Sequence, residues 1–157
     1  MKILVAAHKP CRLPADDCYL PVQAGAALHP PLEGVQGDDT GENISRKNPH
    51  YCELTVLYWA WKNLDADYIG LAHYRRYFAA GRAGEKWGRV AHGPQMEKAL
   101  AKTGLVLPKK RRYFIETSYS QYAHAHHARD LDETRQILAE SWPEYLPAFD
   151  RVMKRTS

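Results

Sequence analysis

Basic and imidazole side chains gather at three places in this 157-residue sequence, each time directly after a short apolar run. The groups are His8-Lys9, then His73-Tyr74-Arg75-Arg76, and finally Lys-Lys-Arg-Arg at 109–112. Arginine grips phosphate oxygens with a planar fork of N–H donors, and histidine titrates near neutral pH. These residue types predict a site for a phosphorylated anion, with a histidine able to orient a hydroxyl or act as a general base.

The apolar runs that precede these groups predict strands over Lys2–Ala7, Asp67–Ala72 and Leu105–Pro108. If the strands are parallel, all three basic groups lie at the carboxyl edge of the sheet, where α/β domains bind ligands. That edge would then carry seven cations, more than the net charge of +4 of the whole chain. The seven are Lys9, Arg75, Arg76, Lys109, Lys110, Arg111 and Arg112. The alternative is that they are merely solvated strand ends.

Helices are expected between and after the strands. Asn48-Pro49 predicts the start of one, because Asn caps free amides and Pro is tolerated in the first turn. Its predicted apolar face consists of Leu54, Leu57, Tyr58, Trp61 and Leu64. Further helices are predicted over Pro94–Thr103 with Gly104 as the stop, beyond Ser120 with Asp130 and Glu133 as a capping box, and over Tyr145–Met153. Strands alternating with helices predict an α/β fold with a mainly parallel sheet.

The stretch 28–47 is predicted to be a long loop, which is usually functional or mobile. Asp38, Asp39, Asn43 and Ser45 give it a dense set of oxygen ligands. These could hold Mg²⁺ or Mn²⁺ on a diphosphate, or hydrogen-bond sugar hydroxyls. The alternative is an Asp/Gly turn followed by a cap for the next helix.

Three other patterns could each indicate a function, but a structural interpretation is favoured for them. His124, His126, His127 and Asp130 are metal-ligating types, but a polar helix start is the more frequent explanation. Arg-Arg-Tyr-Phe occurs at 75–78 and at 111–114, which suits nucleic-acid binding, yet the helices between the copies do not repeat. Trp59 and Trp61 could form a carbohydrate platform, but Trp61 falls on the apolar helix face and is expected in the core.

Length and composition limit the classes of protein to which this chain can belong. The chain is long enough for one domain, and 45% hydrophobic with 25% charged residues is typical of a globular protein. No apolar run reaches the roughly 18–20 residues of a membrane span. Three cysteines without an export signal predict reduced thiols and a cytoplasmic location.

Several blocks of the sequence resemble one known family. They are Gly-Asp-Asp-Thr-Gly-Glu-Asn-Ile-Ser at 37–45, Lys-Asn-Pro-His-Tyr-Cys-Glu-Leu-Thr at 47–55, Tyr-Trp-Ala-Trp-Lys-Asn at 58–63 and Asp-Tyr-Ile-Gly-Leu-Ala-His-Tyr-Arg-Arg-Tyr-Phe at 67–78. The sequence is similar in these blocks to the bacterial domain of unknown function 4422 family. Its members occur among capsular and exopolysaccharide biosynthesis proteins and are regarded as glycosyltransferases.

The resemblance implies a Rossmann-like, single-sheet fold of the nucleotide-diphosphosugar transferase (GT-A-like) type. It implies transfer of a sugar from a nucleotide-diphosphate donor, UDP-galactofuranose among the candidates, to a hydroxyl of a growing capsular, exopolysaccharide or lipopolysaccharide glycan. A glycan or lipid-linked acceptor would bring peripheral contact with the inner membrane. The usual Asp-x-Asp metal motif is not seen, and the chain is shorter than the family, which predicts an incomplete C-terminal part. A non-catalytic nucleotide-sugar or nucleic-acid binding module is the alternative.

The expected site follows from both lines of argument. Arg75 and Arg76 are expected to stabilise the departing diphosphate, and His73 to orient a hydroxyl or act as general base. Residues expected to contact the donor are His8, Lys9, Asp38, Asp39, Asn43, Ser45, Lys47, Asn48 and Tyr74. The metal, if one is used, is not identified.

Overall fold

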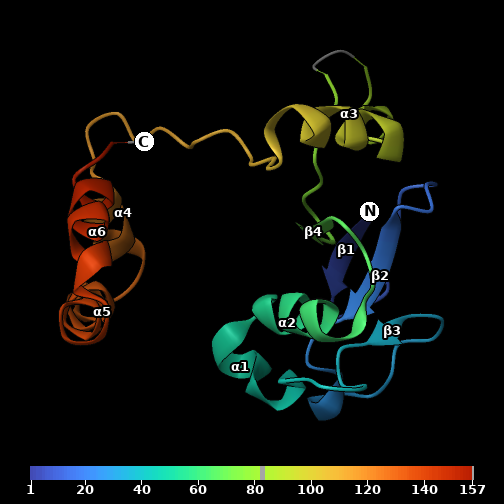
Figure 1. Ribbon diagram of the computed structural model, residues 1–157, viewed down its shortest axis with the longest axis horizontal. Coiled ribbons are helices and arrows are strands. Elements are labelled where there is room, and N and C mark those ends of the chain that lie inside the picture. The colour runs from blue at the N-terminus through green and yellow to red at the C-terminus, as the bar shows by residue number, and fades with distance from the viewer. Residues whose placement is uncertain (82–83, 157) are drawn as a thin grey trace. The chain divides into compact units, whose positions relative to one another are not determined.

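A computed structural model describes residues 1–81 and 84–156 of the chain. Its internal contacts cluster into two compact units, Met1–Val106 and Leu107–Ser157, which we call the N-terminal unit and the C-terminal unit (Figure 1). The sequence predicted one domain over residues 1–157, and that stays a prediction. Each unit is described by itself below.

The N-terminal unit is built on a parallel sheet. The strands that the structure describes are β1 (Lys2–Ala7), β2 (Tyr19–Gln23), β3 (Gln36–Gly37) and β4 (Ile69–His73), in the order β3-β2-β1-β4. Strand β1 is central and pairs in parallel with both β2 and β4. The predicted strands Lys2–Ala7 and Asp67–Ala72 are therefore confirmed, the second with a shift of one or two residues.

Strand β2 was not predicted, and its sequence explains why. Pro21 lies in its middle, and a proline normally argues against an inner strand because it lacks the N–H that the sheet needs. Here Pro21 is opposite Val5 of β1, while β3 pairs only with Val22 and Gln23. The proline therefore occupies the part of β2 that does not pair with β3.

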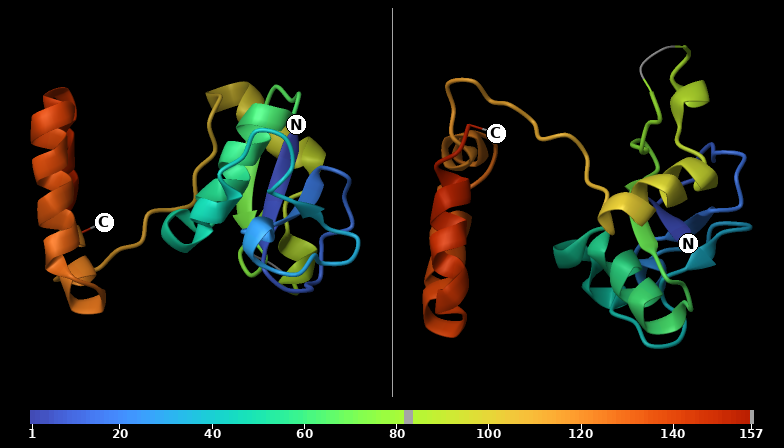
Figure 2. Two further views of the ribbon diagram at one scale, coloured as in Figure 1. Left: turned by 90° about the horizontal axis from the view of Figure 1, so that it is seen from below. Right: turned by 45° about the horizontal axis from the view of Figure 1, so that its top comes forward.

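Helices cover both faces of this sheet, as Figures 1 and 2 show. Helix α2 (Leu54–Asn63) packs on one face, where Leu4 and Ala6 of β1 meet Val56 and Trp59. On the other face Ile3 and Val5 belong to a second cluster with Met96 of α3 (Gly93–Thr103). Alternate side chains of β1 point to opposite faces of the sheet, so this strand contributes to both layers of the core. The prediction of a Rossmann-like α/β fold is confirmed.

The predicted helix from Asn48 onward is two helices, α1 (Asn48–Tyr51) and α2. Cys52 interrupts it with a backbone φ of 47°. Asn48 does not act as the expected cap, because it is the first helical residue and its side chain bridges the break instead. Its Nδ2 donates to Cys52 O at 2.8 Å and to Thr55 Oγ1 at 3.1 Å.

The predicted apolar face of this helix was also wrong. The buried side chains of α2 are Thr55, Val56, Trp59 and Ala60, whereas Leu54 is 53% and Trp61 67% exposed. Apolar residues occur on both sides of this helix, so periodicity alone could not select the side that faces the sheet. Trp61, expected in the core, lies on the surface with Lys62 Nζ 4.1 Å from its ring centroid.

Helix α3 confirms the prediction for 94–103, and Gly104 ends it in the left-handed region with φ 65°. The predicted third strand, however, is absent: residues 105–113 have no regular secondary structure, and Leu105 and Leu107 are 64% and 72% exposed. A short apolar run forms a strand only when a neighbouring strand pairs with it, and no described strand pairs with residues 105–108.

The C-terminal unit consists of α4 (Ser118–Ala125), α5 (Ala128–Ser141) and α6 (Leu146–Met153). The short 3₁₀ turns are Ala26–Leu28, Ser45–Lys47, Trp87–Arg89 and Pro143–Tyr145. Asp130 and Glu133 do not form the predicted capping box, because α5 already begins at Ala128 with His127 as its N-cap. No helix among residues 1–81 and 84–156 is long and apolar enough to cross a membrane.

Candidate functional site

The carboxyl ends of β1 and β4 bring the first two basic groups together around one aromatic ring. Tyr74 is 9% exposed, and its hydroxyl lies 3.4 Å from Nε2 of His8. Lys9 Nζ and Arg75 Cζ lie 5.7 and 5.2 Å from the centre of the same ring. Because β1 and β4 are parallel neighbours, the residues that follow them meet at one edge of the sheet.

We call this group the Tyr74 cluster; it comprises His8, Lys9, His73, Tyr74, Arg75 and Arg76. Lys9, Arg75 and Arg76 are exposed residues, whereas the Tyr74 ring beneath Lys9 and Arg75 is buried. Guanidinium and ammonium groups over a ring face are attracted by its negative quadrupole, which limits their freedom without neutralising them. The arrangement holds Lys9 and Arg75 at a surface that is open to an anionic ligand, and Arg76 is exposed next to Arg75 in the chain.

His73 has a polar partner on each side of its ring, a hydrogen bond at Nδ1 and a nearby carboxylate at Nε2. Its Nδ1 accepts the backbone N–H of Arg75 at 3.1 Å, and its Nε2 lies 3.6 Å from Oε1 of Glu53. An acceptor at Nδ1 places the ring proton of neutral His73 on Nε2, facing the Glu53 carboxylate. This tautomer suits the expected role of orienting a hydroxyl and offers no free lone pair for the general-base role.

The surroundings of His73 lower its pKa below the usual value. Burial is the largest cause, and the positive charge of Arg75 adds to it, while Glu53 acts in the opposite direction. Neutral His73 is therefore favoured around pH 7, which agrees with the tautomer that the backbone N–H of Arg75 selects.

Asp38 is a buried carboxylate that stabilises the surrounding chain by accepting hydrogen bonds. It is 0% exposed, and one carboxylate oxygen accepts from Ala26 N and Ser45 Oγ while the other accepts from Gly25 N and Thr55 Oγ1. Four hydrogen bonds occupy the carboxylate of Asp38, and Ser45 is equally buried. Both residues support the loop after β2, and their expected contact with a donor stays a prediction.

The other predicted donor residues lie along the same edge with different exposure. Asp39 is exposed, and Asn43 Nδ2 donates to the backbone oxygens of Asp39 and Gly41. Lys47 is exposed, whereas Asn48 bridges α1 and α2 and packs against Gly25. A Cβ added at Gly25 would lie 2.8 Å from the Asn48 side chain, and its φ is 67°. This close approach explains why glycine is required there.

The third basic group does not follow a strand as expected. Residues 109–112 come after a stretch without regular structure and are part of the C-terminal unit. The cations that the strands themselves bring to this edge are Lys9, Arg75 and Arg76.

No preformed metal centre occurs among the described residues. They contain no group of three or more His, Cys, Asp or Glu side chains placed to hold one. His124 contacts Glu116 instead, and the carboxylate of Asp38 is engaged as described above. Dependence on Mg²⁺ or Mn²⁺ stays a prediction.

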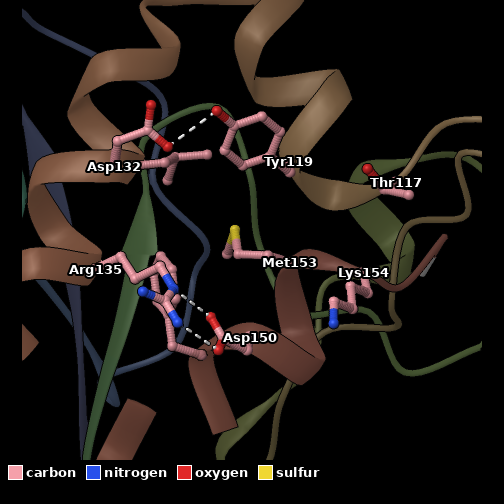
Figure 3. Close-up of a pocket in the computed structure, with 9 residues that line it drawn as sticks. Thr117, Tyr119, Asp132, Arg135, Asp150, Met153 and Lys154 are labelled. Carbon is pink, nitrogen blue, oxygen red and sulfur yellow. Dashed lines mark hydrogen bonds and ion pairs between the residues drawn. The ribbon is translucent and has the colours of Figure 1, made fainter. Parts of the chain in front are cut away.

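The C-terminal unit contains a cavity of about 310 Å³ (Figure 3). Figure 3 shows the Arg135–Asp150 ion pair and the Tyr119–Asp132 hydrogen bond at its wall. The apolar side chains that line it are Leu131, Phe149 and Met153. No residue predicted from the sequence as a site residue lines this cavity.

Sequence reasoning missed two residues of the carboxyl edge. Glu53 was passed over, although it lies in the 47–55 block that resembles the family, because it follows no strand and has no partner nearby in the sequence. Gln23, 2% exposed at the end of β2, donates to Pro30 O at 2.8 Å and accepts from Leu32 N at 2.7 Å. A buried amide just after a strand would have been a signal, had β2 been recognised.

Comparison with known proteins gives an independent view of the chain. No curated protein matches it. Among solved structures it is similar to the apo structure of the bifunctional glycosyltransferase WbbM, with 28% sequence identity and a TM-score of 0.79. The match covers 99% of this chain but 31% of that chain, so this protein spans about a third of the length of WbbM. The family described as domain of unknown function DUF4422 matches residues 2–157, and the chain therefore belongs to this family.

Proposed function

We propose that this protein is a glycosyltransferase whose Tyr74 cluster binds the diphosphate of a nucleotide-sugar donor. The observation that carries the proposal is the convergence of Lys9 and Arg75 on the buried ring of Tyr74 at the carboxyl edge of a parallel sheet, where the exposed Arg76 follows Arg75 in the chain. The similarity to a bifunctional glycosyltransferase and the family membership support it. UDP-sugars, with UDP-galactofuranose among them, are the proposed donors.

The proposed chemistry follows from the charges. Breaking the bond between the sugar and the diphosphate leaves negative charge on the leaving oxygens. Arg75 and Arg76 would bind these oxygens and stabilise that charge as it develops, which lowers the barrier. A neutral His73 with its proton on Nε2 would donate a hydrogen bond to a hydroxyl of the donor or the acceptor. The proposed acceptor is a hydroxyl of a capsular, exopolysaccharide or lipopolysaccharide glycan, free or lipid-linked.

Calorimetric titration with UDP tests the donor site. We expect Arg75→Ala with Arg76→Ala to weaken UDP binding by about 30-fold or more, since each hydrogen bond to a charged group contributes about 1.5–3 kcal/mol. The chain offers a matched control, because Arg-Arg-Tyr-Phe recurs at 111–114. Arg111→Ala with Arg112→Ala removes the same charge and should leave UDP affinity unchanged.

Two results would contradict the proposal. One is equal loss of UDP affinity in both double variants, which would indicate a non-specific charge effect. The other is no binding of nucleoside diphosphates at millimolar concentration together with binding of single-stranded RNA, which would favour a nucleic-acid module. Release of UDP from a UDP-sugar by the intact chain then tests turnover separately from binding.

A further inference from the structure

A short basic and apolar segment of the C-terminal unit is unusually exposed. We call it the 109–115 segment; its residues are Lys109, Lys110, Arg111, Arg112, Tyr113, Phe114 and Ile115. All four cations are exposed, and Phe114 and Ile115 are 83% and 95% exposed. No acidic residue occurs within it. A run of four cations next to two adjacent apolar side chains in water is an arrangement that normally marks an interaction surface.

The backbone holds the two apolar side chains at the tip of a turn. Phe114 has a φ of 61°, a conformation that bulky residues rarely adopt. On either side the turn is attached to the end of α6: Tyr113 N donates to Thr156 O at 2.8 Å, and Ser118 N donates to Arg155 O at 2.7 Å. The exposure of Phe114 and Ile115 is thus built into an anchored turn.

The chemistry of the segment favours a lipid surface over a nucleic acid. Lysine and arginine side chains bind anionic headgroups, and adjacent aromatic and aliphatic side chains insert at the boundary between headgroups and acyl chains. Single-stranded nucleic acid would use the cations and could stack on Phe114. A nucleic acid base cannot stack on Ile115, the most exposed of these side chains, because an aliphatic group has no π face.

We propose that the 109–115 segment docks this protein on the surface of a bilayer that contains anionic phospholipid. The four cations contact headgroup phosphates, and Phe114 with Ile115 enters the interfacial layer. The proposed contact is peripheral, because only side chains of this segment enter the bilayer surface. The proposal does not depend on nucleotide binding at the Tyr74 cluster, which belongs to the other unit.

Co-sedimentation of the full chain with lipid vesicles tests the proposal. One vesicle set is phosphatidylcholine, and the other contains about a third phosphatidylglycerol as the anionic lipid. Wild-type protein should bind the anionic set preferentially, and raised salt should weaken this binding because the ions screen exposed charges.

Two variants and their controls separate the contributions of charge and apolar contact. Replacing Lys109, Lys110, Arg111 and Arg112 by Gln should lower the partition coefficient by about 30-fold or more. The control replaces the exposed Lys86, Lys98, Lys102 and Arg151 by Gln, which gives the same net charge of zero.

Phe114→Gln with Ile115→Gln should lower partitioning by about 10-fold. Leu54→Gln with Trp61→Gln removes another exposed apolar pair and should leave it unchanged.

Each remaining outcome overturns the proposal. Equal binding to both vesicle types would exclude recognition of anionic lipid, and equal losses in a variant and its control would exclude this segment as the contact. Wild-type protein that stays in the supernatant with both vesicle types would exclude docking altogether. Selective loss of binding to a single-stranded RNA, with vesicle binding retained, would assign the segment to nucleic acid.

Discussion

The Nε2 atom of His73 lies 3.6 Å from a carboxylate oxygen of Glu53, at the junction of β4 and α2. Glu53 is the acidic side chain that the structure brings to a cluster of two histidines and three cations. It opposes the effect of Arg75 on the imidazole and limits how far the pKa of His73 falls. The pair therefore sets both the protonation state of His73 and the net charge that an anionic ligand meets.

Glu53→Gln should lower the pKa of His73 further, because it removes the negative charge that favours imidazolium. The same change should strengthen UDP binding a few-fold, since one repulsive charge disappears. Titration of the His73 ring by NMR measures the first effect and calorimetry the second. Glu97→Gln, an exposed carboxylate on α3, is the control. Weaker UDP binding by Glu53→Gln would show instead that Glu53 contacts the ligand.

The lowered pKa of His73 also has a consequence for stability. Below its ordinary pKa of 6.5 the unfolded chain binds a proton that the folded chain resists, so stability should fall as pH drops through this range. His73→Gln should flatten this part of the stability curve, measured by urea unfolding between about pH 5 and pH 8. An unchanged curve would mean that His73 titrates alike in both states.

Asp16 ties the loop before β2 to the start of α3. Its carboxylate accepts from Cys18 N and from Gly93 N, each at 2.9 Å, and contacts His92. Hydrogen bonds from Cys18 are the main cause that lowers the pKa of Asp16 far below its usual value. Its stabilising effect should be present above about pH 4 and be lost as pH falls further.

Asp16→Asn should accordingly cost about 2 kcal/mol of unfolding free energy at neutral pH. The difference from wild type should shrink in acid, because the wild-type carboxylate is then protonated as well. Asp17→Asn, at the exposed neighbouring position, should have little effect. Equal losses in the two variants would contradict the specific role of Asp16.

Asp38→Asn should destabilise the N-terminal unit by about 3 kcal/mol or more. The amide can replace only one of the two oxygens that accept hydrogen bonds, so buried donors of Gly25 and Thr55, or of Ala26 and Ser45, lose their acceptor. Asp39→Asn, at the exposed neighbouring position, is the control for urea unfolding. A fully stable Asp38→Asn protein that no longer binds UDP would instead identify Asp38 as a ligand contact.

Cys52→Gly should stabilise the protein by about 1 kcal/mol. Cys52 has φ 47° and ψ −131°, a region that glycine adopts readily and side chains with a Cβ do not. Cys52→Ala keeps the Cβ and so keeps the strain, and it should give no gain. Thermal unfolding of the two variants decides the point, and equal effects would show that the thiol matters and not the backbone.

Local patterns were sufficient for the parts of the fold that depend on neighbours in sequence. The run 2–7, the run before His73 and the helix ending at Gly104 are confirmed close to their expected bounds. They succeed because a buried strand or a glycine stop leaves its signal within a few residues. The failures at Leu105–Pro108 and at Trp61 share a cause, since burial of an apolar side chain depends on what packs against it.

The sequence by itself determined that this chain forms an α/β fold, that His8-Lys9 and His73–Arg76 follow strands, and that its motifs resemble one family. Strand polarity then requires those two groups to meet, because parallel neighbours end at the same edge. Only the tertiary structure decided that Asp38 is buried among four hydrogen-bond donors, that Glu53 faces His73, and that residues 109–115 are exposed on a different unit. These features involve contacts between residues that are distant in sequence, or they depend on packing. The spacing of residues along the chain predicts neither long-range contacts nor packing.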